Sequence, residues 1–231
     1  MPLCRFTLWP PRTLPMLHLL RILPLLFLSQ LALAQLDSVD YRRFQLGVVA
    51  GQAYQEVDFT PNASVTTYPG QRAGVALRYF DRQLVGFQAE LAYDRAGWRE
   101  DLGTAGAYER QTDYAELLIL TQFSVGRGVV QPLFQIGPYL SAPLAERESL
   151  PPGYDPATQP ANTYYGRELP FRINYGLVAG LGLNLEIGPL TLQVDGRYRQ
   201  GFSNLIKPGE SQASTSIRRG YGGQAALFYA L

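Results

Sequence analysis

The sequence predicts an all-β fold, an eight-stranded antiparallel up-and-down transmembrane β-barrel, and three observations lead to this prediction. Apolar and polar side chains alternate in eight segments, which is the pattern of strands with a lipid-facing side and a lumen-facing side. The connections between these segments are alternately short and long, as in barrels with short periplasmic turns and longer external loops. An apolar stretch near the start of the chain has the features of an export signal.

The first 34 residues are predicted to be a secretory signal peptide, and residues 35–231 are predicted to be the barrel domain. Arg5 and Arg12 precede an apolar stretch that ends in Ala32-Leu33-Ala34, which is the order of a basic start, an apolar middle and a small-residue cleavage site. Prolines and an arginine interrupt the stretch, so a membrane-anchor helix is disfavoured. Met16 is an alternative start, because residues 16–34 alone form a compact signal.

The clearest of the eight predicted strands is Phe171–Ile187. All its odd positions are apolar, and all its even positions except Val178 are polar or glycine. In a strand, these two sets point to opposite faces. The stripe is about three times as long as a usual soluble strand of about 5–6 residues, which favours a strand that crosses a bilayer. Its length predicts that it projects above the membrane at the Phe171 end.

The other seven strands show the same period of two. They are predicted at residues 43–54, 72–80, 84–94, 112–125, 132–142, 190–202 and 219–231. The strand at 171–187 is the sixth of the eight in chain order. The predicted outward faces of the other seven start with Phe44, Leu46 and Val48; Ala73, Val75 and Leu77; Val85, Phe87 and Ala89; Ala115, Leu117 and Ile119; Phe134, Ile136 and Pro138; Leu190, Leu192 and Val194; and Tyr221, Ala225 and Leu227. Leu118 and Leu120 make the inner side of the fourth strand less polar than the others. Most segments supply the 9–11 residues that a tilted membrane strand needs.

The connections give the orientation of the barrel. Short connections are predicted at 81–83, 126–131 and 188–189, and long ones at 55–71, 95–111, 143–169 and 203–218. All short connections then lie at the periplasmic end together with both termini. Aromatic residues gather near both predicted membrane boundaries, as in the aromatic girdles of such barrels. They are Phe44, Tyr79, Phe123 and Tyr229 at the short-turn end, and Tyr93, Tyr198 and Tyr221 at the long-loop end.

Composition excludes several kinds of chemistry. The only cysteine, Cys4, and the only histidine, His18, lie in the predicted signal peptide. Residues 35–231 therefore cannot form a disulfide, a Ser-His-acid triad or a zinc site with His or Cys ligands, and we predict no enzyme activity and no cofactor. Removal of Arg5, Arg12 and Arg21 lowers the formal net charge from +1 to −2, so nucleic acid is not expected as a partner.

Eight charged residues are predicted to face the lumen by their parity in the strands. They are Arg78, Glu90, Glu116, Arg172, Glu186, Asp195, Arg197 and Arg199. The lumen of an eight-stranded barrel is just wide enough for its own side chains, and buried charges need partners. Four acids accompany four arginines, which favours a salt-bridged lumen over a pore. Glu90 and Glu116 are the expected partners of Arg197 and Arg199.

Several strand sequences resemble the PorT-like outer-membrane β-barrel family, the outer membrane protein beta-barrel domain. The similar segments are residues 87–93 (FQAELAY), 114–118 (YAELL), 134–140 (FQIGPYL), 175–182 (YGLVAGLG) and 197–202 (RYRQGF). The resemblance covers the chain from about Phe44 to Leu231 and implies a small eight-stranded barrel, with a link to protein secretion in the founding member. The chain ends in Leu231 where such barrels commonly end in an aromatic residue, although Leu227 and Tyr229 keep the rest of the pattern read by the barrel assembly machinery.

The sequence thus predicts a cell outer-membrane protein that contacts outer-membrane lipid and has a structural or interaction role through its external loops, with an envelope protein as the expected partner. Three alternatives remain at this point. A narrow channel for ions or small solutes would use the lumen charges as a selective ring. A soluble ligand-carrying barrel would require the apolar face to point inward. An enzyme would have to use residues other than histidine and cysteine.

Overall fold

The computed structural model describes residues 44–60, 65–82, 84–101, 106–126, 128–153, 164–166, 168, 172–208 and 213–231. The predicted signal peptide, residues 1–34, lies outside these described residues. Within them, no helix is long and apolar enough to cross a membrane.

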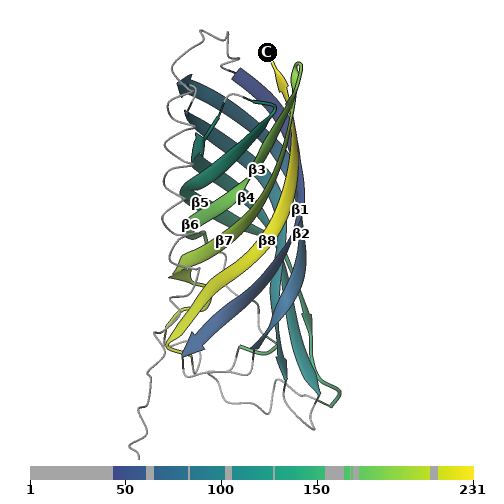
Figure 1. The fold of residues 1–231 in the computed structure, drawn as a ribbon. Coiled ribbons are helices and arrows are strands. Elements are labelled where there is room, and N and C mark those ends of the chain that lie inside the picture. Colours follow the sequence, from purple (N-terminus) through teal and green to yellow (C-terminus); the bar gives the residue numbers. More distant parts are fainter. Residues whose placement is uncertain are drawn as a thin grey trace, which may run out of the picture. The chain divides into compact units, whose positions relative to one another are not determined.

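Eight antiparallel strands form a closed barrel in which each strand pairs with its neighbours in the sequence and β8 pairs with β1. Figure 1 shows the tilted strands winding around one axis, with the C-terminal end of β8 at the top of the view. The strands are β1 (Phe44–Thr60), β2 (Val65–Arg82), β3 (Val85–Asp101), β4 (Ala107–Ser124), β5 (Val130–Ser149), β6 (Asn174–Ile187), β7 (Leu190–Asn204) and β8 (Thr215–Ala230). The predicted fold class is confirmed.

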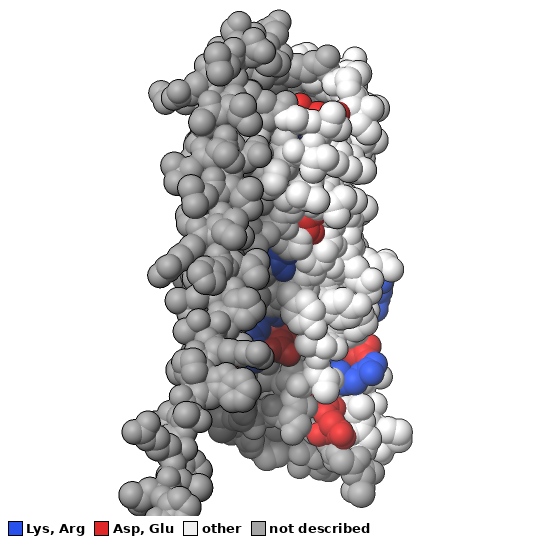
Figure 2. Space-filling model, viewed as in Figure 1, with Lys and Arg blue, Asp and Glu red and all other residues white. Residues whose placement is uncertain are grey.

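The outward face of the barrel is apolar around its short-turn half, as the alternation predicts. Leu46 and Val48 of β1, Leu91 of β3 and Leu181 of β6 are each more than half exposed. Figure 2 shows that charged side chains are sparse on the upper part of the visible face and gather toward its lower end. Large apolar side chains on the outside are unfavourable in water and favourable in lipid, so this band is the membrane-facing surface. An inverted soluble barrel is thereby excluded.

Six strands continue well beyond the predicted membrane segments at the long-loop end. The segment 55–60, predicted as a loop, belongs to β1, and 95–101 belongs to β3. Parts of the other predicted long connections likewise lie in β2, β4, β5 and β8. The loop predictions were wrong here because the outward residues turn polar above the membrane. The inward residues there are a mixture of aromatic and charged side chains, such as Trp98, Glu100 and Arg110, so no simple period of two marks these extensions.

The sixth strand is shorter than its sequence stripe. Strand β6 begins at Asn174, and Arg172 and Ile173 precede it without strand structure, while Phe171 lies outside the described residues. Pairing of β5 with β6 stops at Ser141 and Asn174, whereas β5 runs on to Ser149 along β4. The strands that project beyond the membrane band therefore include β3, β4 and β5 and not β6. At the other end, Gly188 has a φ of 60°, which favours glycine in the two-residue turn to β7.

Candidate functional site

Many of the lumen-facing positions of the strands are polar, and most of these are buried. They belong to inward faces that alternate with the apolar outward positions of the same strands. Buried polar groups are costly unless they are hydrogen-bonded, so the contacts among these side chains decide what the barrel interior can do. Along the barrel axis they form three levels, which we describe from the middle of the barrel outward.

The middle level is a cluster of four arginines and four carboxylates, which we call the lumen cluster. Its members are Arg72, Glu90, Asp94, Glu116, Asp195, Arg197, Arg199 and Arg218, whose side chains are between 0 and 10 % exposed. These residues come from β2, β3, β4, β7 and β8, so the ion pairs cross the lumen and connect strands that are not neighbours. The formal charges of the cluster balance.

Glu90 is one of two carboxylates on which several arginines converge. Its oxygens accept hydrogen bonds from Nη1 of Arg197 at 2.9 Å and Nη2 of Arg197 at 2.7 Å. Nη2 of Arg72 donates to the same carboxylate at 3.0 Å, and Nε2 of Gln88 donates at 2.6 Å. The Nε of Arg197 also donates to Asp195 at 2.6 Å. Two-pronged guanidinium–carboxylate contacts of this kind fix both side chains in one orientation.

Glu116 is the second centre of the lumen cluster. It accepts from both Nη atoms of Arg199 at 2.7 Å, from Nη2 of Arg218 at 2.9 Å and from the hydroxyl of Ser141 at 2.7 Å. Nη1 of Arg72 also pairs with it. Arg72 therefore bridges the two centres, because it contacts Glu90 and Glu116 at once. Asp94 adds a contact with Arg199 at 3.0 Å.

Aromatic rings pack against two arginines of the lumen cluster. The guanidinium carbon of Arg218 lies 4.7 Å from the ring centre of Tyr114 and 5.5 Å from that of Tyr139, and that of Arg199 lies 4.9 Å from Tyr139. Leu118 pairs in register with Tyr139 and packs with Leu120 and Val178 in a buried apolar group. Leu118 and Leu120, which break the polar pattern in the sequence, thus fill the lumen beside these rings.

The level nearest the short turns is held by one arginine among amides. Arg78 donates from Nε to Gln45 at 2.9 Å and from Nη1 to Asn184 and Gln193 at 3.1 Å each. Its guanidinium carbon lies 4.1 Å from the ring centre of Phe228. Amide oxygens and aromatic faces thus take the place of a carboxylate around this buried cation.

Small residues of β1 and β8 lie beside the lumen cluster. Lumen-facing Ala53 of β1 and Gly220 and Gly222 of β8 line a cavity of about 30 Å³ together with Arg72 and Arg197. A cavity of this size has room for water. Nε of Arg72 and Oε1 of Gln55, which also lines the cavity, are buried and make no hydrogen bond among the described residues.

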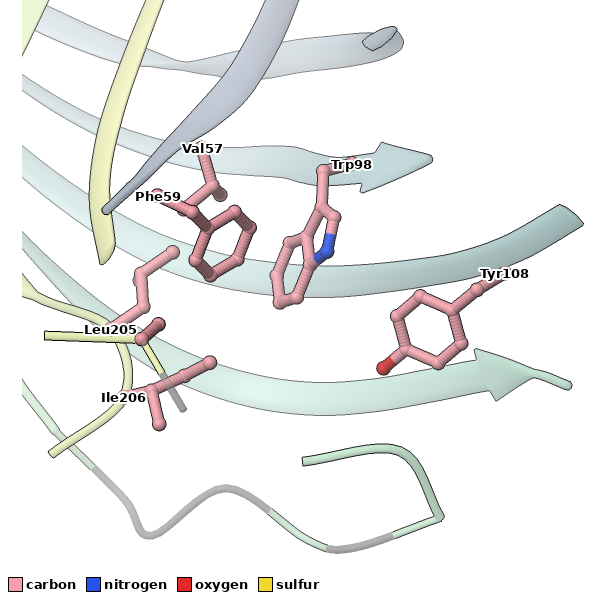
Figure 3. Packing of buried hydrophobic residues seen from close by; sticks show 7 residues of the cluster. Val57, Phe59, Trp98, Tyr108, Leu205 and Ile206 are labelled. Carbon is pink, nitrogen blue, oxygen red and sulfur yellow. The ribbon is translucent and has the colours of Figure 1, made fainter. Parts of the chain in front are cut away.

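The outer end of the lumen is closed by apolar and aromatic side chains, which we call the mouth cluster. Figure 3 shows Phe59, Trp98 and Tyr108 pointing from three strands into one space beside Leu205 and Ile206. Val57 and Ala213 complete the buried group. The rings of Phe59 and Trp98 are 5.7 Å apart and meet edge to face, a favourable arrangement for aromatic pairs.

Three residues of the β5–β6 connection, Tyr164–Gly166, are seated in the mouth cluster, and we call them the strap. The ring of Tyr164 stacks on Phe59 at 5.5 Å, and that of Tyr165 lies 4.1 Å from Tyr108. Both tyrosine hydroxyls donate to Glu100, and the backbone N–H of Gly166 donates to Glu148 at 2.9 Å.

The surroundings of the mouth raise the pKa values of two of its tyrosines. Burial raises the pKa of Tyr108, and its hydrogen bond to Glu148 acts in the same direction, against the opposing charge of Arg110. Burial and the nearby Glu100 raise the pKa of Tyr164. The hydroxyls therefore stay protonated and act as hydrogen-bond donors to the carboxylates throughout the neutral pH range.

Outside the mouth, the outward faces of the projecting strands carry ion pairs. Arg95 contacts Asp113 at 2.9 Å, and Arg219 contacts Glu56 at 2.7 Å. Partial burial alone would raise the pKa of Asp113, but hydrogen bonds from Arg95 and other neighbours hold it below its usual value. These pairs lie next to the tyrosines of the long-loop end, as the bond from Arg95 to the hydroxyl of Tyr93 shows.

The structure brings together five of the eight lumen residues named from the sequence: Glu90, Glu116, Asp195, Arg197 and Arg199. Arg78 is buried but lies in the amide-lined level. Arg172 precedes β6 and is half-buried, and Glu186 is exposed next to the Gly188 turn, so neither joins the lumen cluster. Glu186 has the inward parity of β6 but sits where the lumen opens toward the short-turn end.

Three members of the lumen cluster were not among those eight residues. Arg72 and Asp94 have the inward parity of their predicted strands, so parity alone could have found them. Arg218 lies in a segment predicted as a loop, and only the extension of β8 shows that it points inward. No group of three His, Cys, Asp or Glu residues that could hold a metal ion occurs in the part of the chain that the structure describes.

Comparison with known proteins places this geometry in a wider context. The sequence model of a family described as "Outer membrane protein beta-barrel domain" matches residues 33–207. No curated protein matches the chain.

Three similar solved structures are Ail of Yersinia pestis in complex with the heparin analogue sucrose octasulfate, Neisserial surface protein A, and the outer membrane protein AlkL in lipid bilayers. Each is 14 % identical to this chain. Ail covers 81 % of this chain and 99 % of its own, with a TM-score of 0.43. The corresponding values are 80 %, 97 % and 0.42 for the Neisserial protein and 84 %, 94 % and 0.46 for AlkL.

Proposed function

The chain belongs to the outer membrane protein beta-barrel domain family, and we propose that it is a closed barrel that acts through its outer end, in a structural or binding role. Its location is the outer membrane, where the apolar outward band contacts lipid. In this proposal, neither transport nor catalysis takes place in the lumen. The barrel instead holds its projecting strands and external connections in a fixed arrangement at the cell surface.

The observation that supports this proposal most strongly is the lumen cluster. Eight charged side chains meet across the lumen, with neither Glu90 nor Glu116 exposed to solvent. An ion that passed through would have to break several buried guanidinium–carboxylate contacts at once, and leaving one buried charge unpaired costs about 3–5 kcal/mol. The mouth cluster and the level around Arg78 add further barriers on either side.

Conductance in planar lipid bilayers tests the closed lumen. The purified chain should produce no stable unit steps, because the paired side chains of the lumen cluster leave no continuous path for an ion. Stable steps that disappear or change size in an Arg197→Glu variant would contradict the proposal. The outward variant Arg219→Glu is the matched control, since Arg219 pairs with Glu56 outside the barrel.

A narrow channel is the second candidate, and one observation favours it. The cavity beside Ala53, Gly220 and Gly222 shows that the lumen cluster does not fill its cross-section completely. Movement of the neighbouring Arg72 and Arg197 could widen this space. In that case, the unit steps would depend on the volume at position 53, and Ala53→Leu would block them, whereas lipid-facing Ala50→Leu would not.

The narrower resemblance to PorT-like barrels supports a partner in the cell envelope and a link to protein secretion. A photo-crosslinker attached at Glu168→Cys is suited to this test, because residues 35–231 contain no other cysteine. We expect capture of a component of a secretion apparatus from intact envelopes, compared with a crosslinker at Gly128→Cys in the short β4–β5 connection. Equal capture patterns from the two ends would contradict an interaction through the external loops.

We also propose that the chain is not an enzyme. The lumen cluster uses its carboxylates in ion pairs, and residues 35–231 offer neither histidine nor cysteine as a base or nucleophile. Peptide or lipid turnover by the purified barrel, lost when one residue of the outer end is substituted, would overturn this statement.

A further inference from the structure

The mouth cluster contains an aromatic box with carboxylates at its floor, and the strap occupies it. Phe59, Trp98 and Tyr108 supply three inward-facing rings from β1, β3 and β4. Glu100 of β3 and Glu148 of β5 lie against the same rings, since Trp98 donates to Glu100 at 2.7 Å and Tyr108 donates to Glu148 at 2.6 Å. The space between them is filled by Tyr164 and Tyr165.

Among the residues that the structure describes, the charges of the mouth do not balance, in contrast to those of the lumen cluster. Glu100 is only 3 % exposed and makes no ion pair among the described residues; it accepts hydrogen bonds from the indole of Trp98 and the hydroxyls of Tyr164 and Tyr165. Arg110 is the cation beside these acids, and it pairs with Glu146 at 2.6 Å and lies 3.9 Å from Glu148. A buried carboxylate held only by neutral donors is weakly compensated.

Aromatic faces and carboxylates together favour a cation. Ring faces attract ammonium and guanidinium groups, and the attraction is strongest where water is excluded. The strap donates two hydroxyl hydrogen bonds to the carboxylate of Glu100 and adds two aromatic rings. Its three residues carry no positive charge. We propose that the aromatic box is a binding site for a small organic cation, an ammonium or guanidinium group on an apolar body, and that such a ligand displaces the strap.

This inference gives the outer-end binding role a ligand class and therefore rests on the proposed function. The strap acts as an internal competitor: it keeps Phe59 and Trp98 away from water when the ligand is absent. Binding then costs the contacts of the strap, and weakening the strap should strengthen binding. This dependence separates the proposal from non-specific binding of cations to surface acids.

Trp98 reports on the site directly. It is the only tryptophan of residues 35–231, and Trp9→Phe in all samples removes the other one. Fluorescence of the chain in a non-ionic detergent is followed while benzylamine is added at neutral pH, with uncharged benzyl alcohol as the probe of equal shape. We expect a saturable change with benzylamine and none at the same concentrations with benzyl alcohol.

Two variants sharpen the test. Tyr164→Phe combined with Tyr165→Phe keeps the rings of the strap but removes both donors to Glu100, and it should lower the half-saturating benzylamine concentration at least tenfold. Tyr175→Phe combined with Tyr221→Phe, on the lipid-facing side, should leave it unchanged. Glu100→Gln should abolish the preference for the cation, while Glu109→Gln on the outer surface should keep it. Heat-dependent migration in gels confirms the folded barrel for every variant.

Equal responses to the two probes would overturn the inference, as would unchanged or weaker benzylamine binding in the strap variant. Neither result would bear on whether the lumen is closed, because conductance measures that separately. Conversely, if the barrel conducts ions and also binds benzylamine selectively, the proposal of a closed lumen is refuted but the proposal of a cation site at the mouth is supported.

Discussion

The lumen cluster and the mouth cluster close the same barrel by different physical means. In the lumen cluster, charged groups from five strands neutralise one another in ion pairs at 2.6–3.0 Å, such as those of Glu90 with Arg72 and Arg197. In the mouth cluster, aromatic rings pack together, and the carboxylates are held mainly by neutral donors. The lumen cluster loses its charge balance if any one of its partners is removed. The mouth cluster depends on the packing of apolar volume, so a ligand can replace the strap there. We therefore expect the lumen cluster to determine stability and the mouth cluster to permit binding.

The largest effect is expected when one centre of the lumen cluster is neutralised. Glu116→Gln leaves Arg199 and Arg218 buried beside an amide, and we expect the free energy of unfolding to fall by about 3–5 kcal/mol. Urea titration of the barrel in lipid vesicles measures it. The exposed pair of Arg99 with Glu109 supplies the control: Glu109→Gln should cost less than about 1 kcal/mol. Similar losses for both variants would show that the lumen cluster is no more cooperative than a surface pair.

A smaller effect is expected from the mouth cluster. Phe59→Leu removes the ring contacts with Trp98 and Tyr164, each worth about 0.5–1.5 kcal/mol, so the loss should be about 1–3 kcal/mol. The change should appear as greater solvent exposure of Trp98 in fluorescence quenching, with the barrel still folded. Unfolding of the whole barrel at the same denaturant concentration as Glu116→Gln would contradict the division between the two regions.

Alkaline pH should lower the stability of the barrel through the tyrosines of the mouth. The pKa values of Tyr108 and Tyr164 are raised in the folded chain, chiefly by burial, whereas an unfolded tyrosine ionises near pH 10. Below about pH 10, both states are protonated and the contribution of these tyrosines is fully present. Above it, the unfolded state releases protons that the folded state retains, so stability falls as pH rises.

The slope of unfolding free energy against pH between about 9 and 11 tests this statement. Tyr108→Phe combined with Tyr164→Phe should flatten the slope, while Tyr175→Phe combined with Tyr221→Phe on the outward side should not. Parallel slopes for all three proteins would contradict the assignment of the effect to the mouth.

The smallest effect is expected outside the barrel. Arg219 pairs with Glu56 at 2.7 Å, but its side chain is 44 % exposed, so Arg219→Ala should cost only about 0.2–1 kcal/mol. Salt should reduce even this difference, because exposed charges are screened. A loss as large as that of Glu116→Gln, measured by the same urea titration, would mean that burial does not separate the two kinds of ion pair.

Sequence patterns predict the membrane-crossing part of this barrel because one rule governs it. From Leu84 to Asp94, for example, lipid outside and polar partners inside impose a strict period of two. Above the membrane, polar side chains occur on both faces of a strand, so the sequence pattern predicts loops where β1 and β3 continue as strands. Trp98 and Tyr108 are therefore missed as a cluster, although each lies at an inward position of a continuing strand.

Parity identifies Glu90 and Arg197 as inward residues, and the expected pairs of Glu90 with Arg197 and of Glu116 with Arg199 are both present. Depth along the axis determines which other charges join them. Glu186 has the correct parity and lies too close to the short-turn end, whereas Arg218 lies in an extension that the sequence does not reveal. The strap is beyond sequence reasoning of this kind, because its contacts with Phe59 and Glu100 join segments that have no shared periodicity.

The central claim is that the lumen cluster by itself is sufficient to keep ions from passing through the barrel. Planar-bilayer recording of the Tyr164→Ala and Tyr165→Ala double variant tests it most directly, because this variant removes the two rings of the strap from the mouth cluster and leaves all eight charges of the lumen cluster in place. We predict that the variant, like the unmodified chain, shows no stable unit conductance. Stable steps in the double variant alone would show that the strap is the closing element and would contradict the claim.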